Sequence, residues 1–205
     1  MTMGIRIREQ VVAMALGIVL STATLAAVNV GQPAPGFSGI DTRGQRIALE
    51  DYRGQVVVLE WTNHDCPYVR KHYDSGNMQA HQREAAGNGV VWLSVISSAP
   101  GKQGHVTAAE ADELTAQRGA APTAVILDPA GHIGRLYGAR TTPHMYIIDR
   151  DGALAYMGGI DSIVSTDPAD IAQATAYTRI ALNEVVAGKT VQRAVTRPYG
   201  CSVKY

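Results

Sequence analysis

Two cysteines are the residues with the clearest chemistry in this 205-residue sequence. Cys66 is followed by Pro67 and then by a helical pattern, so we expect it at or beside the N-cap of a helix. The unpaired backbone N–H groups and the positive end of the helix dipole stabilise a thiolate at such a position. Arg70 and Lys71 add positive charge within the next turn. The sequence therefore favours a reactive, solvent-open thiol over an inert core cysteine.

The second cysteine, Cys201, lies 135 residues after Cys66 (201 − 66 = 135) in a tail without clear periodicity. Two cysteines are too few for a disulfide scaffold but enough for one redox couple. The entropy of closing a loop grows slowly with its length, so this separation does not prevent the thiols from meeting. Cys201 is thus open to three interpretations: a resolving thiol, a structural or intermolecular bridge, or a free thiol in the tail.

Three polar residues precede Cys66 and are candidates for the same site. Thr62, Asn63 and His64 can donate hydrogen bonds to a thiolate or to a leaving oxygen, or they can simply cap the helix and shape the loop. A different class of site is also compatible with this stretch. His64 and Cys66, together with His72 or another histidine, could hold a soft metal such as copper.

The elements that must position Cys66 are a strand before it and a helix after it. The apolar β-branched run at 56–59 predicts a buried strand, and 60–65 a loop. The helix should run from Pro67 to about Ala86, kinked or split by the irregular residues 74–77. Residues 90–96 predict a second buried strand. Strand, helix and strand in this order indicate a right-handed crossover between two parallel strands.

The remaining segments alternate between strand and helix signals. A hairpin is expected at 37–40 and 45–49, a helix at 108–119 behind a capping box, and a strand at 123–127. A short helix is expected within 128–138, followed by a hairpin of strands at 144–149 and 153–157. Asp167 and Pro168 predict the start of one last helix that ends at Gly188.

Composition excludes some functions. Hydrophobic residues make up 46% of the chain, enough for a proper core, and the formal net charge is zero. Without a basic face, nucleic acid is not an expected partner. Nothing in the sequence implies a nucleotide, flavin or haem, so no cofactor is expected.

The N-terminal residues 1–27 predict a targeting segment. Arg6 and Arg8 precede an apolar stretch at 11–27 that ends in small residues. This pattern is typical of a cleaved signal peptide, and a retained membrane anchor is the alternative. Either way the protein is expected outside the cytoplasm, in the periplasm or an equivalent compartment, free or tethered to the membrane. One domain is expected at 31–205, with a C-terminal tail at 188–205.

Several motifs resemble the redoxin domains of the alkyl-hydroperoxide-reductase/thiol-specific-antioxidant family, which are peroxiredoxin-like proteins with the thioredoxin fold. The motifs that carry the resemblance lie at 32–37, 41–44, 49–54, 61, 66–69, 75–79, 142–143 and 198–205, and those at 66–69, 75–79 and 198–205 resemble an exported subgroup. The resemblance covers roughly residues 31–205. It implies an α/β three-layer sandwich with a mixed central sheet, an N-terminal hairpin, and a C-terminal helix followed by a tail.

The resemblance also implies roles for individual residues. Pro143 is similar to the cis-proline that lies against the active cysteine in this fold; an ordinary trans proline at a strand start is the alternative. Val69 occupies the place of the second cysteine of a C-x-x-C motif, so Cys201 is the resolving candidate within the chain. Asn63 stands where the family's peroxidatic sites carry Thr or Ser, and Thr62 is the neighbouring hydroxyl.

The chemistry that follows is that of a thiol peroxidase or a thiol–disulfide oxidoreductase, with Cys66 as nucleophile. Its partners would be a peroxide or a protein disulfide as substrate and an external thiol as reductant; the oligomeric state is open. Two alternatives remain. A copper-binding chaperone would use His64 and Cys66, although the second nearby cysteine that such proteins usually contribute is absent. A redox-inert binding scaffold on the same fold is the other.

Overall fold

The computed structural model describes residue 1 and residues 28–205. The expected leader, at residues 1–27, lies almost wholly outside the described part of the chain. Among the described residues, no helix is both long and apolar enough to cross a membrane.

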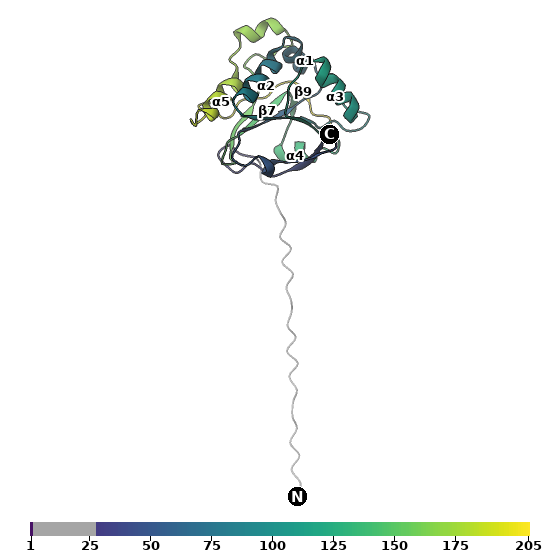
Figure 1. The fold of residues 1–205 in the computed structure, drawn as a ribbon, viewed down its shortest axis with the longest axis vertical. Coiled ribbons are helices and arrows are strands. Elements are labelled where there is room, and N and C mark those ends of the chain that lie inside the picture. The colour runs from purple at the N-terminus through teal and green to yellow at the C-terminus, as the bar shows by residue number, and fades with distance from the viewer. Residues whose placement is uncertain (2–27) are drawn as a thin grey trace.

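A seven-stranded mixed sheet forms the centre of the fold, as expected from the sequence (Figure 1). β3, β4 and β5 run parallel, whereas β1, β7 and β8 join this group through antiparallel pairings. In spatial order the strands are β2 (Arg46–Ala48), β1 (Ser38–Asp41), β5 (Ala124–Leu127), β4 (Val91–Ile96), β3 (Val57–Trp61), β7 (His144–Ile148) and β8 (Leu154–Gly158). A second, two-stranded sheet joins β6 (Thr141–Thr142) to β9 (Cys201–Ser202) in antiparallel register.

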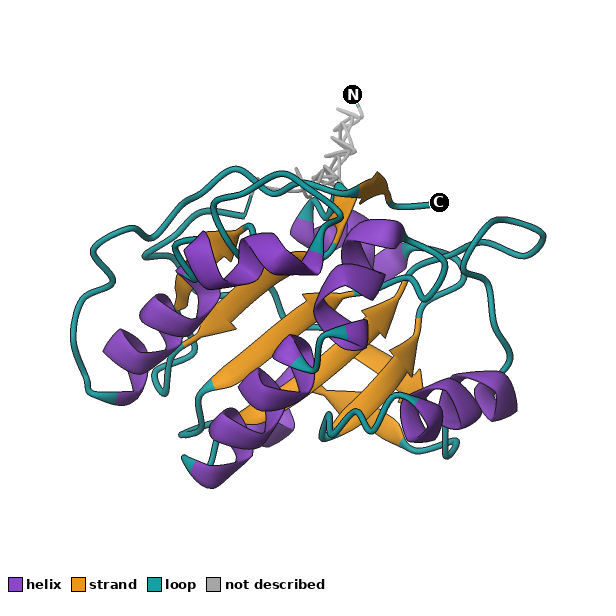
Figure 2. Cartoon of the chain, turned by 90° about the horizontal axis from the view of Figure 1, so that it is seen from above, coloured by secondary structure: helices purple, strands orange, loops and turns teal. Residues whose placement is uncertain are grey.

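Helices cover both faces of the large sheet and complete three layers. Four lie on one face, visible together in Figure 2: α1 (Pro67–Asp74), α2 (Asn77–Gly87), α3 (Ala108–Gln117) and α5 (Tyr177–Val186). The short α4 (His132–Tyr137) packs on the opposite face. Two 3₁₀ helices, η1 (Leu49–Tyr52) and η2 (Pro168–Gln173), connect the other elements. The expected three-layer α/β sandwich is thereby confirmed.

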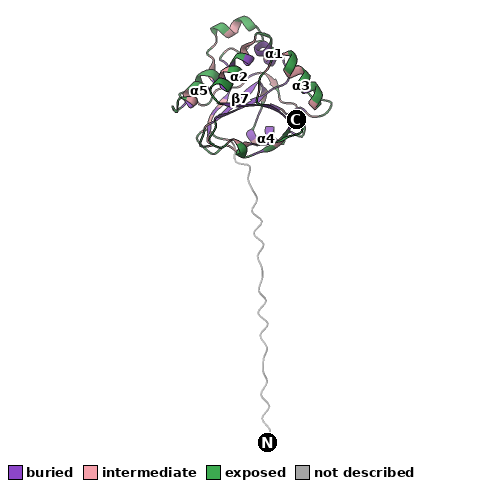
Figure 3. Cartoon of the chain, viewed as in Figure 1, coloured by how far each residue is buried: buried purple, intermediate pink, exposed green. Residues whose placement is uncertain are grey.

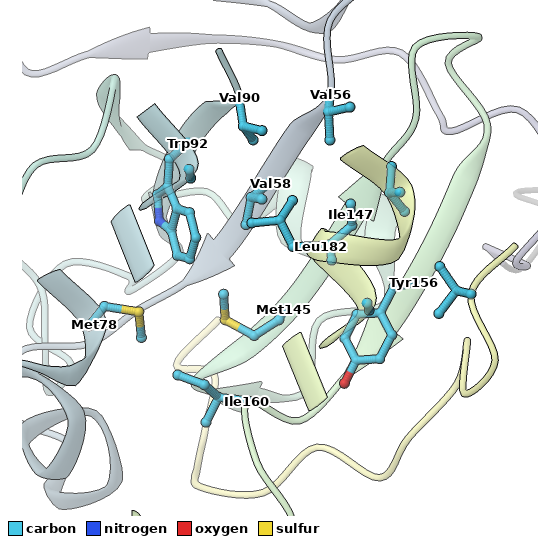
Figure 4. Packing of buried hydrophobic residues seen from close by; sticks show 14 of the residues in the cluster. Val56, Val58, Met78, Val90, Trp92, Met145, Ile147, Tyr156, Ile160 and Leu182 are labelled. Carbon is cyan, nitrogen blue, oxygen red and sulfur yellow. The ribbon is translucent and has the colours of Figure 1, made fainter. Parts of the chain in front are cut away.

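Two apolar layers hold the sheet to its helices. Residues of β3, β4, β7 and β8 meet α1, α2 and α5 in the first layer, where Val58, Trp92 and Leu182 lie together (Figure 4). The second layer, under α4, contains both Trp61 and Tyr137. Figure 3 shows this buried material along the sheet and exposed residues on the outer sides of the helices. Full burial of each large apolar side chain contributes about 1.5–3 kcal/mol, so these layers supply most of the stabilisation.

β3 extends further than its apolar run predicted. Glu60 and Trp61 were expected in a loop, yet both are buried within the strand. The Glu60 carboxylate is accommodated because it accepts hydrogen bonds from Tyr73 Oη (2.8 Å), Trp92 Nε1 (2.8 Å) and Ser94 Oγ (2.9 Å). A buried carboxylate with several donors no longer carries the full cost of desolvation. β3 therefore reaches two residues closer to Cys66.

Two helix predictions are corrected in their details. The helix that begins at Pro67 is split, as the sequence allowed, because Gly76 adopts a left-handed φ of 76° between α1 and α2. The single helix expected from Asp167 to Gly188 is instead η2 followed by α5. Ala174 is extended between them (ψ 147°), which separates the two elements.

Candidate active site

Cys66 is the N-cap residue of α1, as the sequence predicted. Its backbone is extended (φ −75°, ψ 121°), and Pro67 occupies the first helical turn. The Cys66 carbonyl accepts hydrogen bonds from the backbone N–H groups of Val69 (3.0 Å) and Arg70 (2.9 Å). The cysteine thus sits where the helix dipole favours negative charge.

The expectation that this thiol is open to solvent is wrong for the structure described here. Cys66 is 0% exposed. Its Sγ donates to the carbonyl oxygen of Thr142 (3.0 Å) and accepts the backbone N–H of Cys201 (3.4 Å). The C-terminal tail therefore lies directly over Cys66, which excludes water from the sulfur.

The structure brings Cys201 and Pro143 to Cys66. The Thr142–Pro143 peptide bond is cis, in agreement with the expectation for Pro143. Thr142 pairs with Cys201 across the β6–β9 ladder, so one short sheet holds the proline loop and the tail together. A contact between residues 135 positions apart, which sequence left open, is thereby established.

The two cysteines are free thiols that interact directly. The pKa of Cys201 is raised to about 12, first by burial and then by the hydrogen bond to Cys66 and by its charge. The Cys201 thiol is therefore protonated at neutral pH. A neutral Cys201 thiol thus lies beside Cys66, and it must lose its proton before it can attack another sulfur.

Gly200 allows the tail to approach this closely. Its φ is +134°, and a Cβ built there would lie 2.0 Å from the carbonyl oxygen of Thr142. Only a glycine combines this backbone conformation with the contact. Because Gly200 immediately precedes Cys201, its close approach to Thr142 determines the position of the Cys201 thiol.

Thr62 and Asn63 occupy the loop before Cys66 without bonding to its sulfur, as far as the described residues show. Asn63 Oδ1 accepts the backbone N–H of Asp65 (2.9 Å), and its Nδ2 donates to the carbonyl of Gln103 (3.4 Å). The Thr62 hydroxyl is buried, has no hydrogen-bond partner among the described residues, and lines a cavity of about 40 Å³. The Asn63 contacts shape the loop, whereas the Thr62 hydroxyl makes no hydrogen bond within the described residues.

The histidines proposed for copper do not converge with Cys66. His64 Nε2 lies 3.3 Å from Asp65 Oδ1. His72 pairs instead with Asn77 through Nδ1 (2.9 Å). Over residues 1 and 28–205, no group of three or more His, Cys, Asp or Glu side chains is arranged to hold a metal ion. The copper alternative gains no support from this geometry.

A buried polar cluster beside Cys66 was not foreseen in the sequence. Lys71 Nζ lies 3.4 Å from Asp161 Oδ2, and both side chains are buried, at 2% and 5% exposure. The Tyr199 hydroxyl donates to the other oxygen of Asp161. This hydrogen bond, with burial as the first cause, raises the pKa of Tyr199 well above its usual value. No local pattern reveals such a cluster, because its members lie 38 and 90 residues apart.

We expect acidification from pH 7 to pH 4 to lower the free energy of unfolding by on the order of 5 kcal/mol. Burial lowers the pKa of His72 to about 4 and that of His144 to about 3, from 6.5. Below pH 6.5 both imidazoles therefore bind protons in the unfolded chain, whereas they stay neutral in the folded chain until the pH approaches the lowered pKa values. The stabilisation is complete above pH 6.5 and is lost as the pH falls toward the folded pKa values.

Urea unfolding between pH 4 and pH 7 measures this dependence. His144→Gln should flatten the slope by removing the contribution of that histidine. His132→Gln is a suitable control because His132 is exposed. An equal slope in wild type and His144→Gln would contradict the assignment.

The mixed sheet, the helices on its two faces and the cis-proline beside Cys66 define a thioredoxin-like fold. The profile of the AhpC/TSA family matches residues 30–157, which is more than half of the chain. The protein belongs to the AhpC/TSA family.

Individual relatives agree with this assignment. A 70-residue stretch is 43% identical to the thioredoxin-dependent peroxide reductase, mitochondrial, of Drosophila melanogaster, and it covers 33% of this chain and 30% of that relative. The match thus spans under a third of the relative's length. An uncharacterized conserved protein from Geobacillus kaustophilus has a similar structure (TM-score 0.73, 22% identity, 86% of this chain and 92% of that chain). A protein from Chlorobium tepidum, described as thiol:disulfide interchange protein DsbE, is also similar (TM-score 0.52, 26% identity, 64% and 85% covered).

Proposed function

We propose that the protein is a thiol-dependent peroxidase in which Cys66 is the nucleophile and Cys201 resolves it. The observation that carries the proposal is the placement of the Cys201 thiol and N–H against Cys66 Sγ at a helix N-cap. The peroxide reductase among the relatives supports a peroxide as substrate. So does the complete burial of Cys66, because a small molecule reaches a covered thiol more readily than a folded protein does.

The proposed reaction uses Cys66, Cys201, one peroxide molecule and an external dithiol. The Cys66 thiolate attacks one peroxide oxygen, the O–O bond breaks, and the distal oxygen leaves as an alcohol or water after taking up a proton. Cys66 becomes a sulfenic acid. Cys201 then attacks this sulfur, which forms the Cys66–Cys201 disulfide and releases water. An external dithiol reduces the disulfide, becomes oxidised itself and returns two free thiols.

Thiol–disulfide exchange is the second candidate, supported by the similarity to the interchange protein from C. tepidum. Here Cys66 attacks a substrate disulfide and releases one substrate thiol. Cys201 then displaces the other substrate thiol from the mixed disulfide. The same intramolecular disulfide results, so the two activities differ in the oxidant and not in the cysteines. Access for a protein disulfide would require a larger displacement of the tail.

The setting of the reaction is also part of the proposal. Residues 31–205 would form the catalytic domain, with the tail at 188–205 delivering Cys201. Residues 1–27 would export the protein or anchor it, which places the domain in an oxidising compartment where a cysteine pair needs a dedicated reductant. Thr62 would assist as a hydrogen-bond donor near the site, and Asn63 by holding the loop before Cys66.

Intact mass after one equivalent of hydrogen peroxide tests the proposal. Wild type should lose 2 Da, about the mass of two hydrogens, and yield a Cys66–Cys201 peptide on non-reducing digestion. Cys201→Ser should instead gain about 16 Da, one oxygen, at Cys66. If wild type gains oxygen without forming the disulfide, the resolving role of Cys201 is wrong. If insulin disulfides are reduced and peroxide is not consumed, thiol–disulfide exchange replaces the peroxidase assignment.

A further inference from the structure

Residues 199–205, here named the cover, close Cys66 from solvent. The cover is fixed to the domain on both sides of Cys201. After Cys201, Val203 N–H donates to the Arg140 carbonyl (3.0 Å) and Tyr205 Oη donates to the Ala139 carbonyl (2.8 Å). Before Cys201, the attachment is the side chain of Tyr199. A substrate reaches Cys66 only when at least one of these attachments opens.

The attachment through Tyr199 differs from the one through Val203 and Tyr205 because its acceptor is a charged side chain and because it reaches α1. Asp161, which accepts the Tyr199 hydroxyl, is buried and is held by Lys71 of α1. The Tyr199 ring also packs edge-on against Tyr68, with centroids 5.8 Å apart. Tyr68 and Lys71 both belong to the helix that Cys66 caps. Tyr199 therefore ties the cover to the element that carries the nucleophile.

The desolvation of the buried Lys71–Asp161 ion pair means that this cluster adds little to the stability of the fold. A buried ion pair loses most of its attraction to desolvation, and well-packed apolar residues often serve the fold equally well. What the ion pair provides is an oriented, charged acceptor, and hydrogen bonds to charged acceptors are roughly twice as strong as neutral ones. The Asp161 carboxylate directs the Tyr199 hydroxyl to one position, two residues before Cys201.

We propose that Tyr199 is a positioning residue that latches the cover through Asp161 and Lys71, holding Cys201 against Cys66 and setting how often Cys66 opens to substrate. This inference rests on the proposed function for its role in turnover, but the latch itself is a property of the fold. With the latch closed, the sulfenic acid is sheltered and meets Cys201. With the latch open, peroxide enters and the external thiol reaches the disulfide.

Alkylation of Cys66 measures opening of the cover without any turnover. In a Cys201→Ala background, iodoacetamide reacts only with Cys66, and its rate is proportional to the fraction of molecules that are open. Tyr199→Phe removes the hydrogen bond to the carboxylate and keeps the ring on Tyr68. Loss of a hydrogen bond to a charged group should raise the alkylation rate at least tenfold.

Tyr137→Phe is the matched control because it also removes one tyrosine hydroxyl hydrogen bond, to the Pro35 carbonyl (2.7 Å), and neither partner of that bond belongs to the cover. Its alkylation rate should equal that of the background protein. Equal rates for Tyr199→Phe and the background would overturn the latch, and so would an equal rise in Tyr137→Phe, which would indicate general loosening.

A second readout separates positioning from stability. With both cysteines present, the equilibrium constant for the Cys66–Cys201 disulfide against glutathione should fall by about the same factor in Tyr199→Phe and stay at the wild-type value in Tyr137→Phe. An unchanged constant in Tyr199→Phe would overturn the positioning role. The proposed function can fail on its own: if no peroxide is consumed while Tyr199→Phe still exposes Cys66, the latch stands and the peroxidase assignment does not.

Discussion

Cys66→Ser should lower peroxide turnover at least a thousandfold. The first chemical step needs a nucleophile that is ionised near neutral pH and can accept an oxygen atom, and among side chains of this size only the cysteine thiolate does both. A serine hydroxyl at the same N-cap can still donate to the Thr142 carbonyl, as Cys66 Sγ does at 3.0 Å. The substitution therefore removes the chemistry and preserves the local hydrogen bond.

The measurement is steady-state peroxide consumption with a dithiol reductant, at equal protein concentrations. Cys201→Ser separates the two thiols: it should keep the first equivalent of peroxide consumed and lose the intramolecular disulfide. Circular dichroism and thermal unfolding of each variant show whether the fold is retained. Consumption by Cys66→Ser at the wild-type rate would exclude Cys66 as the nucleophile, and a wild type that consumes no peroxide would return the protein to the class of redox-inert scaffolds.

The order of elements could be predicted because its signals are local. Pro67 marks the helix start, the valines at 56–58 mark the central strand, and the glycines at 87 and 89 mark the end of α2. From these, the crossover rule gives the parallel pairing of β3 with β4 that the structure contains. The position of Cys66 at the N-cap followed from the same reasoning.

The environment of Cys66 could not be predicted, because distant segments create it. The thiol is buried by a tail 135 residues away, through a two-residue ladder with β6 that no periodicity reveals. The sequence gives no reason to connect Asp161 with Tyr199, and their connection through Lys71 appears only in the structure. Local charge placed Lys71 near the site correctly, but as a free positive charge, whereas in the structure a carboxylate pairs with it.

The burial of Cys66 makes its reactivity depend on the opening of the cover. A helix N-cap makes Cys66 a candidate nucleophile, but a nucleophile at 0% exposure acts only as fast as its cover opens. The same cover carries Cys201, which we propose as the resolving thiol. Opening for the substrate and closing for the disulfide are therefore alternative states of one segment, and any change that favours one state disfavours the other.

Gly200→Ala is the substitution that should shift this balance most. A Cβ at residue 200 would lie 2.0 Å from the Thr142 carbonyl oxygen and 2.7 Å from its carbon, and backbone cannot yield as a flexible side chain can. The φ of +134° adds strain for any residue with a Cβ. The pairing of Thr142 with Cys201 must then break, and the Cys201 N–H leaves the Cys66 sulfur. We expect iodoacetamide to alkylate Cys66 at least a hundredfold faster in a Cys201→Ala background, and the peroxide-induced disulfide to form in low yield when both cysteines are present.

Gly44→Ala is the control for backbone strain, since Gly44 has a φ of +76° in the distant β1–β2 turn with no atom within 4 Å of a built Cβ. It should destabilise the fold modestly and leave Cys66 as protected as before. Thermal unfolding of Gly200→Ala should still be cooperative, because both apolar layers lie outside the cover apart from Tyr199 and Cys201 in the first and Val203 at the edge of the second. If Cys66 in Gly200→Ala is alkylated at the background rate, the tail is not what shields the thiol. The burial of Cys66 would then have to come from the loop at 62–65 and from α1 itself.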